Sequence, residues 1–292
     1  LRIYLGNPMR MIANTIWKGI VYILKVPWVL VKPGPARNKR KKSLRLRLIY
    51  RLLWTFRILL IALAIDALYL HHTWPNWSKL QHGSIPKSAF IKNYQVARKS
   101  NPQLPPLRWN PVSIRKISKH MRLAVIVSED SRFFNHKGID MRALADAIEY
   151  NFNNMEFKYG ASTITQQTVK NLFLNPSKNP LRKWHELILT MGMENNLRKS
   201  RILNLYLNIA EFGKGIYGVE AAARHYWHIS ATELSAVHAS ELAATLPSPQ
   251  KHNPRTRTKA FIERVKKIRQ FMRQSSLRTL GAKPWRRKPM SY

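Results

Sequence analysis

The feature that most constrains this chain is an apolar segment at residues 48–70, LIYRLLWTFRILLIALAIDALYL. As a helix it would reach about 35 Å, against about 30 Å for the hydrocarbon core of a bilayer. Arg51 lies near one end and can extend toward the interface, whereas Arg57 and Asp66 lie deeper and each costs about 2.5–3.5 kcal/mol on insertion scales. We therefore predict one transmembrane helix; the alternative is a buried helix of a soluble core.

The segment before this span is strongly basic. Residues 32–47 contain eight basic residues and no acidic residue, so the positive-inside rule places this side in the cytoplasm and everything after residue 70 outside. The run Lys39–Lys42 would also suit nuclear localisation or nucleic acid, but its position beside a span favours the membrane interpretation. Residues 11–31 form a second, interrupted apolar stretch, which we expect to be an interfacial helix rather than a second span.

The overall charge suggests a polyanionic partner. The formal net charge is +37, from 51 Lys and Arg against 14 Asp and Glu, which is typical of proteins that meet nucleic acid, an anionic membrane or a phosphorylated substrate. The excess lies mainly at the ends: residues 1–57 hold fourteen basic residues and no acid, and residues 251–292 hold fourteen and one acid. The middle of the chain has a more ordinary balance of basic and acidic residues. Cysteine is absent, which excludes disulfides, thiolate metal ligands and a Cys nucleophile.

Helical patterns dominate after a proline-punctuated connector at residues 71–112. Two apolar stripes have helical spacing: Met141, Leu144, Ala145, Ile148 and Phe152 after the N-cap Asp140, and Phe261, Val265, Ile268 and Met272. Further helix starts are predicted by capping boxes at Ser230–Glu233 and Thr163–Gln166 and by the pair Asn179-Pro180. We therefore predict a mainly α domain.

Glu129 is the first candidate for chemistry. It ends an apolar helical run, 121–127, and precedes a loop rich in aromatic residues that Gly138 closes, EDSRFFNHKG. A carboxylate in that place can be partly desolvated, as many general bases are. Taken alone, it could equally be a glutamate that caps a backbone amide at a helix end.

A second motif, GASTITQQ, begins at Gly160. Glycine permits a close approach of backbone to ligand, and the helix that follows would offer free amide N–H groups and a positive dipole to an anion. Gln166 and Lys170 lie four residues apart on one helical face, with Gln167 beside them. The plainer alternative is a solvated helix surface.

The third and fourth motifs are RKWHE and KSRILNLYLN. In the third, Arg182 and Glu186 lie four residues apart and Lys183 can reach the same region; by itself this is a surface ion pair worth under about 1 kcal/mol. The fourth, 199–208, carries an apolar helical stripe that includes Tyr206 and is therefore expected to be mostly scaffold.

In this order and at these separations, the four segments resemble the monofunctional biosynthetic peptidoglycan glycosyltransferases, also called peptidoglycan transglycosylases. The resemblance covers roughly residues 105–255, and four motifs in series argue against coincidence. It implies a mainly α, lysozyme-like helical glycosyltransferase domain with a small membrane-facing subdomain, behind an N-terminal transmembrane helix.

The resemblance also implies roles for individual residues. Two are expected to be catalytic: Glu129 would take the proton from the 4-hydroxyl of the acceptor sugar, and Glu186 would position cations or a divalent metal ion without acting as a general acid. Donor binding would fall to Ser162, Thr163, Gln166, Gln167, Lys170, Arg182 and Lys183. The expected reaction polymerises lipid II by inverting transfer and releases undecaprenyl diphosphate.

The expected partners are lipid II, the growing glycan strand and the membrane, and not nucleic acid; other cell-wall synthesis or division proteins are left open. No cofactor is expected beyond an optional divalent cation, Mg²⁺ or Mn²⁺, at the diphosphate, and the His residues show no metal-binding spacing such as H-E-x-x-H. The expected location is the bacterial inner membrane, as a single-pass protein with its catalytic domain on the periplasmic side.

These expectations divide the chain into a basic cytoplasmic or interfacial segment (1–47), a transmembrane helix (48–70), a connector (71–112), the glycosyltransferase domain (113–275) and a basic tail (276–292). Asn204 and His238 stand where the family usually carries Glu, which puts local packing or cation binding in doubt rather than the reaction. The alternatives are a membrane-anchored lytic transglycosylase or lysozyme-like hydrolase, and a basic protein that binds nucleic acid or anionic membranes.

Overall fold

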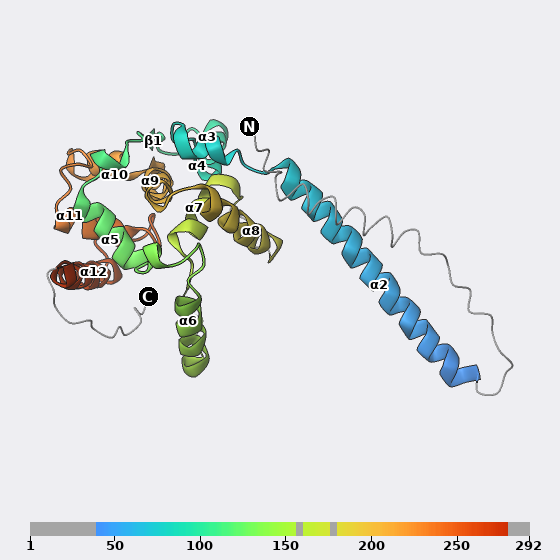
Figure 1. The fold of residues 1–292 in the computed structure, drawn as a ribbon. Coiled ribbons are helices and arrows are strands. Elements are labelled where there is room, and N and C mark those ends of the chain that lie inside the picture. The colour runs from blue at the N-terminus through green and yellow to red at the C-terminus, as the bar shows by residue number, and fades with distance from the viewer. Residues whose placement is uncertain (1–38, 156–159, 176–179, 280–292) are drawn as a thin grey trace, which may run out of the picture. The chain divides into compact units, whose positions relative to one another are not determined.

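The computed structural model describes residues 39–155, 160–175 and 180–279, with the backbone alone for 39–45, 180 and 276–279. The chain divides into two compact units, Leu1–Pro75 and Asn76–Tyr292. The described residues of both units are mostly helical, which confirms the mainly α fold (Figure 1). The expected interfacial helix at 11–31 and the last part of the basic tail lie outside the described residues.

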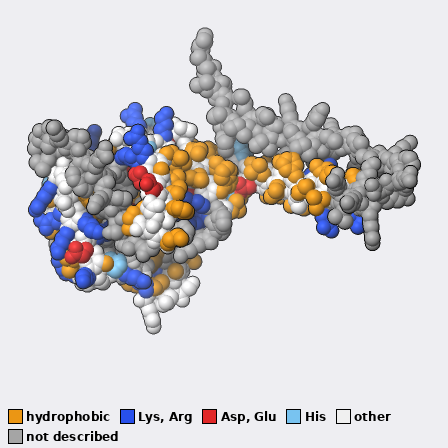
Figure 2. All heavy atoms as spheres, turned by 90° about the horizontal axis from the view of Figure 1, so that it is seen from below, with side chains coloured by type: hydrophobic (Ala, Val, Ile, Leu, Met, Phe, Trp, Pro, Cys, Tyr) orange, Lys and Arg blue, Asp and Glu red, His pale blue; other side chains and the backbone are white. Residues whose placement is uncertain are grey.

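The first unit is a long helix, α2 (Lys39–His72), which extends past both ends of the predicted span. Its portion Leu46–His72 is long and apolar enough to cross a membrane, and none of its apolar window is buried. Large side chains such as Leu52 and Leu59 are 61% and 66% exposed, and Figure 2 shows apolar side chains along this helix. A helix that is apolar all round and unburied is compatible with lipid, and the alternative of a buried core helix has no support.

The described part of the second unit is mostly helical, with one small sheet. Its helices are α3 (Trp77–His82), α4 (Ala89–Ser100), α5 (Lys119–Glu129), α6 (Met141–Asn154), α7 (Ile164–Phe173), α8 (Pro180–Asn196), α9 (Lys199–Ile209), α10 (Val219–Trp227), α11 (Ala236–Thr245) and α12 (Lys259–Thr279). Short 3₁₀ helices lie at Ile114–Lys116 and Phe133–Asn135. The expected connector, 71–112, contains α3, α4 and the strand β1 (Arg108–Trp109), so its prolines separate short elements of the folded unit.

The core is centred on α9, in which every residue from Ile202 to Ile209 is buried. On one side α7 packs against α9 and α8, and on the other α5 packs against α11 and α12. The apolar stripe predicted for α12 is confirmed, because Phe261 and Ile268 are 1% and 0% exposed. These contacts bring helices that are distant in sequence to the C-terminal end of α5.

A three-stranded sheet, in the order β1-β3-β2, is fastened to the end of α9. Strand β3 (Ile216–Tyr217) pairs in parallel with β1 and antiparallel with β2 (Glu211–Gly213). Asn208 makes the connection: its side chain accepts from the Val112 N–H at 2.7 Å and donates to the Val112 carbonyl at 2.9 Å. Its own carbonyl accepts from the Trp109 indole N–H at 2.9 Å. One amide thus aligns β1 with the core helix.

The sequence predicts four helix starts. Three of them can be compared fully with the structure, and two of these, at Asp140 and at Thr163–Gln166, are confirmed. Asp140 caps α6 by accepting from the N–H groups of the two residues after Met141. Thr163 and Gln166 form the reciprocal capping box of α7. Pro180 begins α8, while Asn179, its predicted N-cap, lies outside the described residues.

The third, the predicted helix start at Ser230–Glu233, is wrong. The glutamate does accept from the N–H and hydroxyl of the serine, but the four residues form a turn, and α11 begins only after its cap Ser235. Tertiary hydrogen bonds explain the difference. The Ala231 N–H donates to Glu220 at 2.7 Å, and the Ala231 carbonyl accepts from the Ser118 N–H at 2.9 Å. These bonds fix the segment against α5 and α10.

Helix α6 differs from the helices of the core. Its apolar stripe has the predicted spacing, yet Met141, Ile148 and Phe152 are 66%, 60% and 79% exposed. Among the described residues, no side chain of α6 is buried. Figure 1 shows α6 extending away from the helices around α9. This stripe is therefore not part of the core.

Gly138 closes the loop between α5 and α6 in a conformation that other residues rarely adopt, with φ at +88°. A Cβ there would lie 2.6 Å from Thr190 Cγ2 and 2.9 Å from Glu194 Cγ. We expect Gly138→Ala to lower the free energy of unfolding by about 1–3 kcal/mol through overpacking and backbone strain. Gly160→Ala is the control, because its Cβ would meet nothing within 4 Å. Thermal unfolding of both variants in detergent tests this; equal melting temperatures would contradict it.

Candidate active site

The carboxylate of Glu129, the last residue of α5, is held by two other helices. Its Oε1 accepts from Nη2 of Arg264 on α12 at 2.9 Å, and its Oε2 accepts from Nε2 of Gln167 on α7 at 2.9 Å. The side chains of Glu129 and Arg264 are 8% and 13% exposed. The predicted base is therefore largely desolvated and ion-paired, but not sealed from solvent.

Gln167 is engaged at both ends of its amide. Its Nε2 donates to Glu129, and its Oε1 accepts from the hydroxyl of Tyr206 on α9 at 2.9 Å. Tyr206 is 1% exposed. The amide expected to bind the donor thus orients Glu129 in this structure, and donor binding by Gln167 stays a prediction.

Lys170 lies one turn further along α7. Burial lowers the pKa of its ammonium group, the negative charges of Glu186 and Glu129 raise it, and the positive charges of Arg182 and Lys183 lower it. All four predicted charged groups thus lie within electrostatic range of this lysine. The structure brings the candidate base and the candidate cations into one cluster.

The third motif lies in the first turns of α8. Glu186 is buried, and its Oε1 accepts from Nζ of Lys183, which is itself about half exposed. The ion pair expected between Arg182 and Glu186 is replaced by this i,i+3 pair. Arg182 is half-buried beside it.

Two amides at the N-terminus of α7, which we expected to be free for an anion, are occupied by protein groups. The Ile164 N–H donates to Oδ2 of Asp130 at 3.1 Å, and the Gln166 N–H donates to the Thr163 hydroxyl at 3.2 Å. Thr163 and Gln166 are buried and committed to the capping box, whereas Ser162 is exposed. A protein carboxylate takes the place where a substrate anion was expected. Donor binding by these three side chains stays a prediction.

The loop after Glu129 is fixed by its own polar groups. Nδ1 of His136 accepts from the Gly138 N–H at 3.1 Å, so Nε2 carries the proton of the neutral ring and donates to Asp130 at 2.9 Å. Burial raises the pKa of Asp130, and the hydrogen bond from His136 opposes this shift. The Gly138 carbonyl accepts from the Thr163 hydroxyl at 2.6 Å, which ties the loop to α7.

A second set of contacts holds the loop against α8 and α9. Glu194 accepts from the hydroxyl of Thr165 and from Nζ of Lys199, the latter at 2.7 Å. Lys199 also lies 4.5 Å from the ring centroid of Phe133, which is fully buried. Phe134 contacts Phe133 edge-on at 5.1 Å and is 61% exposed. The aromatic residues thus pack the loop, as predicted.

Asp130, His136 and Asp140 place ligand-type atoms within 4.8 Å of one another. Each carboxylate is already occupied by proton donors: Asp130 by His136 and Ile164, and Asp140 by a bidentate ion pair with Arg132 at 2.6 and 2.8 Å. A cation would have to displace these donors. The cluster fits a structural network better than a metal centre.

Comparison with known proteins now bears on this arrangement. The family model described as Transglycosylase matches residues 102–273. The biosynthetic peptidoglycan transglycosylase of Methylobacillus flagellatus is 35% identical over 236 residues, which are 79% of this chain and 100% of that protein. Proteins of the same name from Marinomonas sp. and Haemophilus influenzae are 47% and 48% identical over 169 and 166 residues, 58% and 56% of this chain and 75% and 68% of theirs.

The chain belongs to the transglycosylase family. Two positions depart from the Glu expected in that family, and neutral contacts accommodate both. Asn204 is buried, and its Oδ1 accepts from Nδ2 of Asn208 at 2.9 Å. His238 stacks on Trp227 with ring centroids 4.6 Å apart and planes 26° apart. Neither site needs a charge in this transglycosylase.

Two features of the site are not indicated by the transglycosylase motifs. Arg264 directly precedes Val265 in the apolar stripe of α12. The sequence signal available for its role is therefore a cation beside a buried stripe. Tyr206 lies in an apolar stripe that the sequence predicts to be scaffold, so the pattern does not indicate a role for its hydroxyl. Both contacts join elements that are far apart in sequence, which motif spacing does not reveal.

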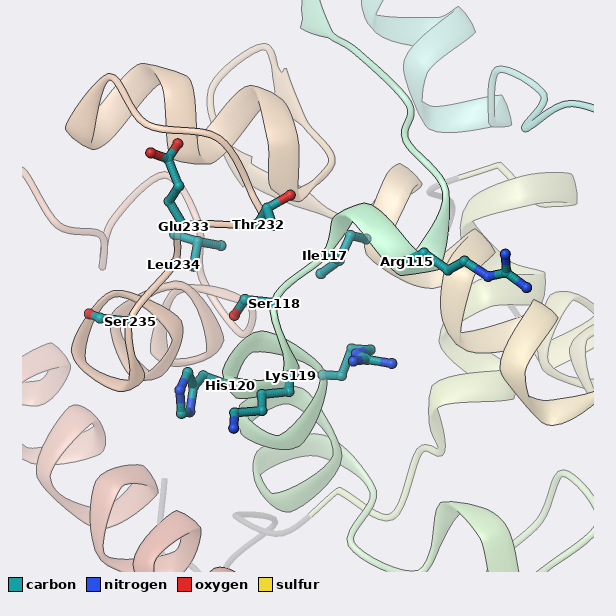
Figure 3. Close-up of a pocket in the computed structure, with 10 residues that line it drawn as sticks. Arg115, Ile117, Ser118, Lys119, His120, Thr232, Glu233, Leu234 and Ser235 are labelled. Atoms are coloured by element: carbon teal, nitrogen blue, oxygen red, sulfur yellow. The ribbon is translucent and has the colours of Figure 1, made fainter.

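A hollow lies near the N-terminal end of α5, outside this cluster. It has a volume of about 490 Å³ and is lined by Arg115, Ile117, Ser118, Lys119, His120, Arg122 and Thr232 to Ser235. Figure 3 shows Arg115 pointing away from Lys119 and His120, and Glu233 on the far side from both. Since the cationic groups diverge, they do not converge on one anion.

The lowered pKa of Lys170 has a consequence for the transglycosylase reaction. Its ammonium group loses its proton below the ordinary value of 10.5, and a neutral lysine cannot neutralise a diphosphate. We expect the polymerisation rate to fall with rising pH below 10.5, and Lys170→Arg to move this fall to higher pH because Arg stays protonated. Rates measured upward from about pH 7 test this, with the exposed Lys214→Arg as control. An alkaline limb unchanged by Lys170→Arg would count against it.

Proposed function

We propose that this peptidoglycan glycosyltransferase polymerises lipid II into glycan strands, anchored by α2 in the bacterial inner membrane with its catalytic unit on the periplasmic side. Family membership supports the reaction class. The main support for this substrate is one cluster of charged side chains. The desolvated carboxylate of Glu129 and the cations Arg182 and Lys183 all influence the pKa of Lys170. A sugar donor with a diphosphate leaving group requires both kinds of group.

In the proposed reaction, Glu129 accepts the proton of the acceptor 4-hydroxyl. The hydroxyl oxygen attacks the anomeric carbon of the donor from the side opposite the diphosphate, so the configuration inverts. The bond between that carbon and the diphosphate oxygen breaks, and undecaprenyl diphosphate leaves with the electron pair. Glu129 later returns its proton to solvent.

Three cations support the departure of the leaving group: Lys170, Arg182 and Lys183. Preorganised positive charge stabilises the negative charge that develops on the diphosphate, so the leaving group needs no proton. Glu186 orients Lys183, and it would supply one carboxylate oxygen to a Mg²⁺ or Mn²⁺ ion whose other ligands come from the diphosphate and water. Such an ion would add to the charge neutralisation that these cations provide.

The alternative of a hydrolase is less well supported. Glycoside hydrolysis uses two carboxyl groups, one of which donates a proton to the leaving oxygen. Glu186 is buried and its carboxylate accepts from the ammonium group of Lys183, so the structure engages it with a cation rather than leaving it free as an acid for the leaving oxygen. The nucleic-acid alternative depends on charge alone, and membership of the transglycosylase family accounts for the chain without it.

Two apolar surfaces support a membrane location. Helix α2 is exposed and apolar over Leu46–His72, and α6 exposes Met141, Ile148 and Phe152. An exposed apolar stripe on an amphipathic helix is costly in water and favourable at a lipid interface. We propose that α6 belongs to the membrane-facing part of the catalytic unit.

Glu129→Gln is the direct test of the base. The amide keeps the shape of the side chain but cannot accept the proton, so we expect polymerisation of lipid II to fall at least about 100-fold while lipid II binding is largely retained. Glu263→Gln, an exposed change on α12, should leave the rate unchanged. Near-normal polymerisation by Glu129→Gln would refute the assignment, and release of fragments from intact peptidoglycan by the unmodified enzyme would favour the hydrolase.

The membrane contact of α6 can be tested with one fluorophore, because the chain contains no cysteine. An environment-sensitive label on Ile148→Cys should show a blue-shifted emission when the full chain is reconstituted in vesicles. The same label on Asp146→Cys, on the opposite face of the helix, should report water. Equal emission from the two positions would contradict a lipid contact for this stripe.

A further inference from the structure

The carboxylate of Glu129 is fixed from two directions by groups that the four motifs do not assign to catalysis. Arg264 of α12 donates to Oε1, and the Tyr206 hydroxyl of α9 acts on Oε2 through the amide of Gln167. We propose that Arg264 and Tyr206 are positioning residues for Glu129: Tyr206 holds the Gln167 amide in place, and Arg264 holds the buried carboxylate in place through an ion pair. This rests on the proposed function, in which Glu129 is the base.

The argument for Tyr206 begins with the amide of Gln167. Rotated by half a turn, this amide would point its oxygen at the Glu129 carboxylate, and two acceptors would face each other. The carboxylate of Glu129 only accepts, so it takes the Nε2 end, and the Tyr206 hydroxyl holds the other end of the amide by donating to Oε1 at 2.9 Å. Tyr206 is 1% exposed within a fully buried stretch of α9, so its ring has little freedom to move. A rigid hydroxyl on the core helix therefore holds the amide in place against the base.

The argument for Arg264 begins with the burial of the carboxylate. A carboxylate that is 8% exposed is destabilised by loss of solvent unless a cation compensates for it. Arg264 lies at 2.9 Å, and Lys170 adds its charge from α7; Gln167 is neutral, and Asp130 is turned toward His136 and Ile164. Arg264 is the one cation in direct contact with Glu129 among the described residues. It is therefore the main electrostatic partner of this buried carboxylate.

The same contacts leave the base able to react. An ionised carboxylate offers about four lone-pair directions, and the two hydrogen bonds of Glu129 occupy one on each oxygen. The acceptor hydroxyl can therefore reach Glu129 without displacing either partner. A fixed carboxylate with a free lone pair meets the geometric requirement of a general base.

Tyr206→Phe removes one hydroxyl and keeps the ring. We expect kcat for lipid II polymerisation to fall about tenfold, with KM unchanged, since one neutral hydrogen bond is lost from the support of the base. Tyr226→Phe is the matched control: it loses the part-buried hydrogen bond from its hydroxyl to the Phe212 carbonyl at 2.7 Å, remote from Glu129. In a Gln167→Met background, Tyr206→Phe should have no further effect, because the group through which it acts is absent. Equal kcat for Tyr206→Phe and Tyr226→Phe, or an undiminished effect in that background, would overturn this part.

Arg264→Gln tests the second part through the pH dependence of kcat. Without the cation, the pH at which activity is half lost on the acid side should rise by about one unit, and Arg264→Lys should restore most of this shift. Lys266→Gln removes the same charge from an exposed position on the same helix and should leave the profile in place. An acid limb that does not move in Arg264→Gln, or that moves equally in Lys266→Gln, would overturn the role of Arg264. If Arg264→Gln does not fold, the melting curve shows it, and Tyr206→Phe still decides the first part.

Glu129→Gln separates failure of this inference from failure of the proposed function. Loss of activity in Glu129→Gln with normal behaviour of Tyr206→Phe and Arg264→Gln would overturn the positioning roles alone. Activity retained in Glu129→Gln would overturn the base itself.

Discussion

The site depends on the buried carboxylate of Asp130. Among the described residues it joins the loop after α5 to the N-terminus of α7, through hydrogen bonds from His136 and from the Ile164 N–H. Burial raises its pKa, so the ionised form is held against a desolvation cost that its donors oppose. This interaction fixes the alignment of the loop with α7. Because Asp130 directly follows Glu129, binding Asp130 to α7 also places Glu129 beside Gln167. A hydrophobic contact could join the same helices without setting that register.

Helix α7 then sets the spacing between base and cations. Gln167 contacts Glu129, and Lys170, three residues further on, lies among the charges of α8. Three residues of helix rise about 4.5 Å, so one rigid turn separates the two halves of the site by a distance suited to one sugar ring. Because α7 packs on α9 and α8, the core that stabilises the fold also fixes this separation. Helix α7 therefore both positions the groups of the site and packs in the core.

Local sequence signals predicted much of this structure. Apolar periodicity located α9 and α12, and side-chain caps located α6 and α7, because these signals act within one or two helical turns. The charged residues of the first and third motifs do meet around Lys170. The errors arose where a distant partner overrode a local pattern: Glu220 and Ser118 hold the Ser230–Glu233 turn, and Asp130 occupies one of the amides expected to bind an anion. The contact between Arg264 and Glu129 is not predicted for the same reason, because the two residues lie far apart in the sequence of the catalytic unit.

The cations of α8 have apolar neighbours that are not buried. Leu181 and Trp184, on either side of Arg182 and Lys183, are 53% and 44% exposed, and Met191 further along is 49% exposed. In a wholly aqueous site such residues would carry an unfavourable hydration cost. A lipid-linked diphosphate presents this combination of chemistry, because its charged group joins a polyprenyl chain that stays in the bilayer. Under the proposed function, the first turns of α8 lie at the boundary between the two media, with cations for the diphosphate and apolar side chains for the lipid next to it. Glu129, held by Arg264 and Gln167, then lies one sugar away, on the side of the water-soluble acceptor groups.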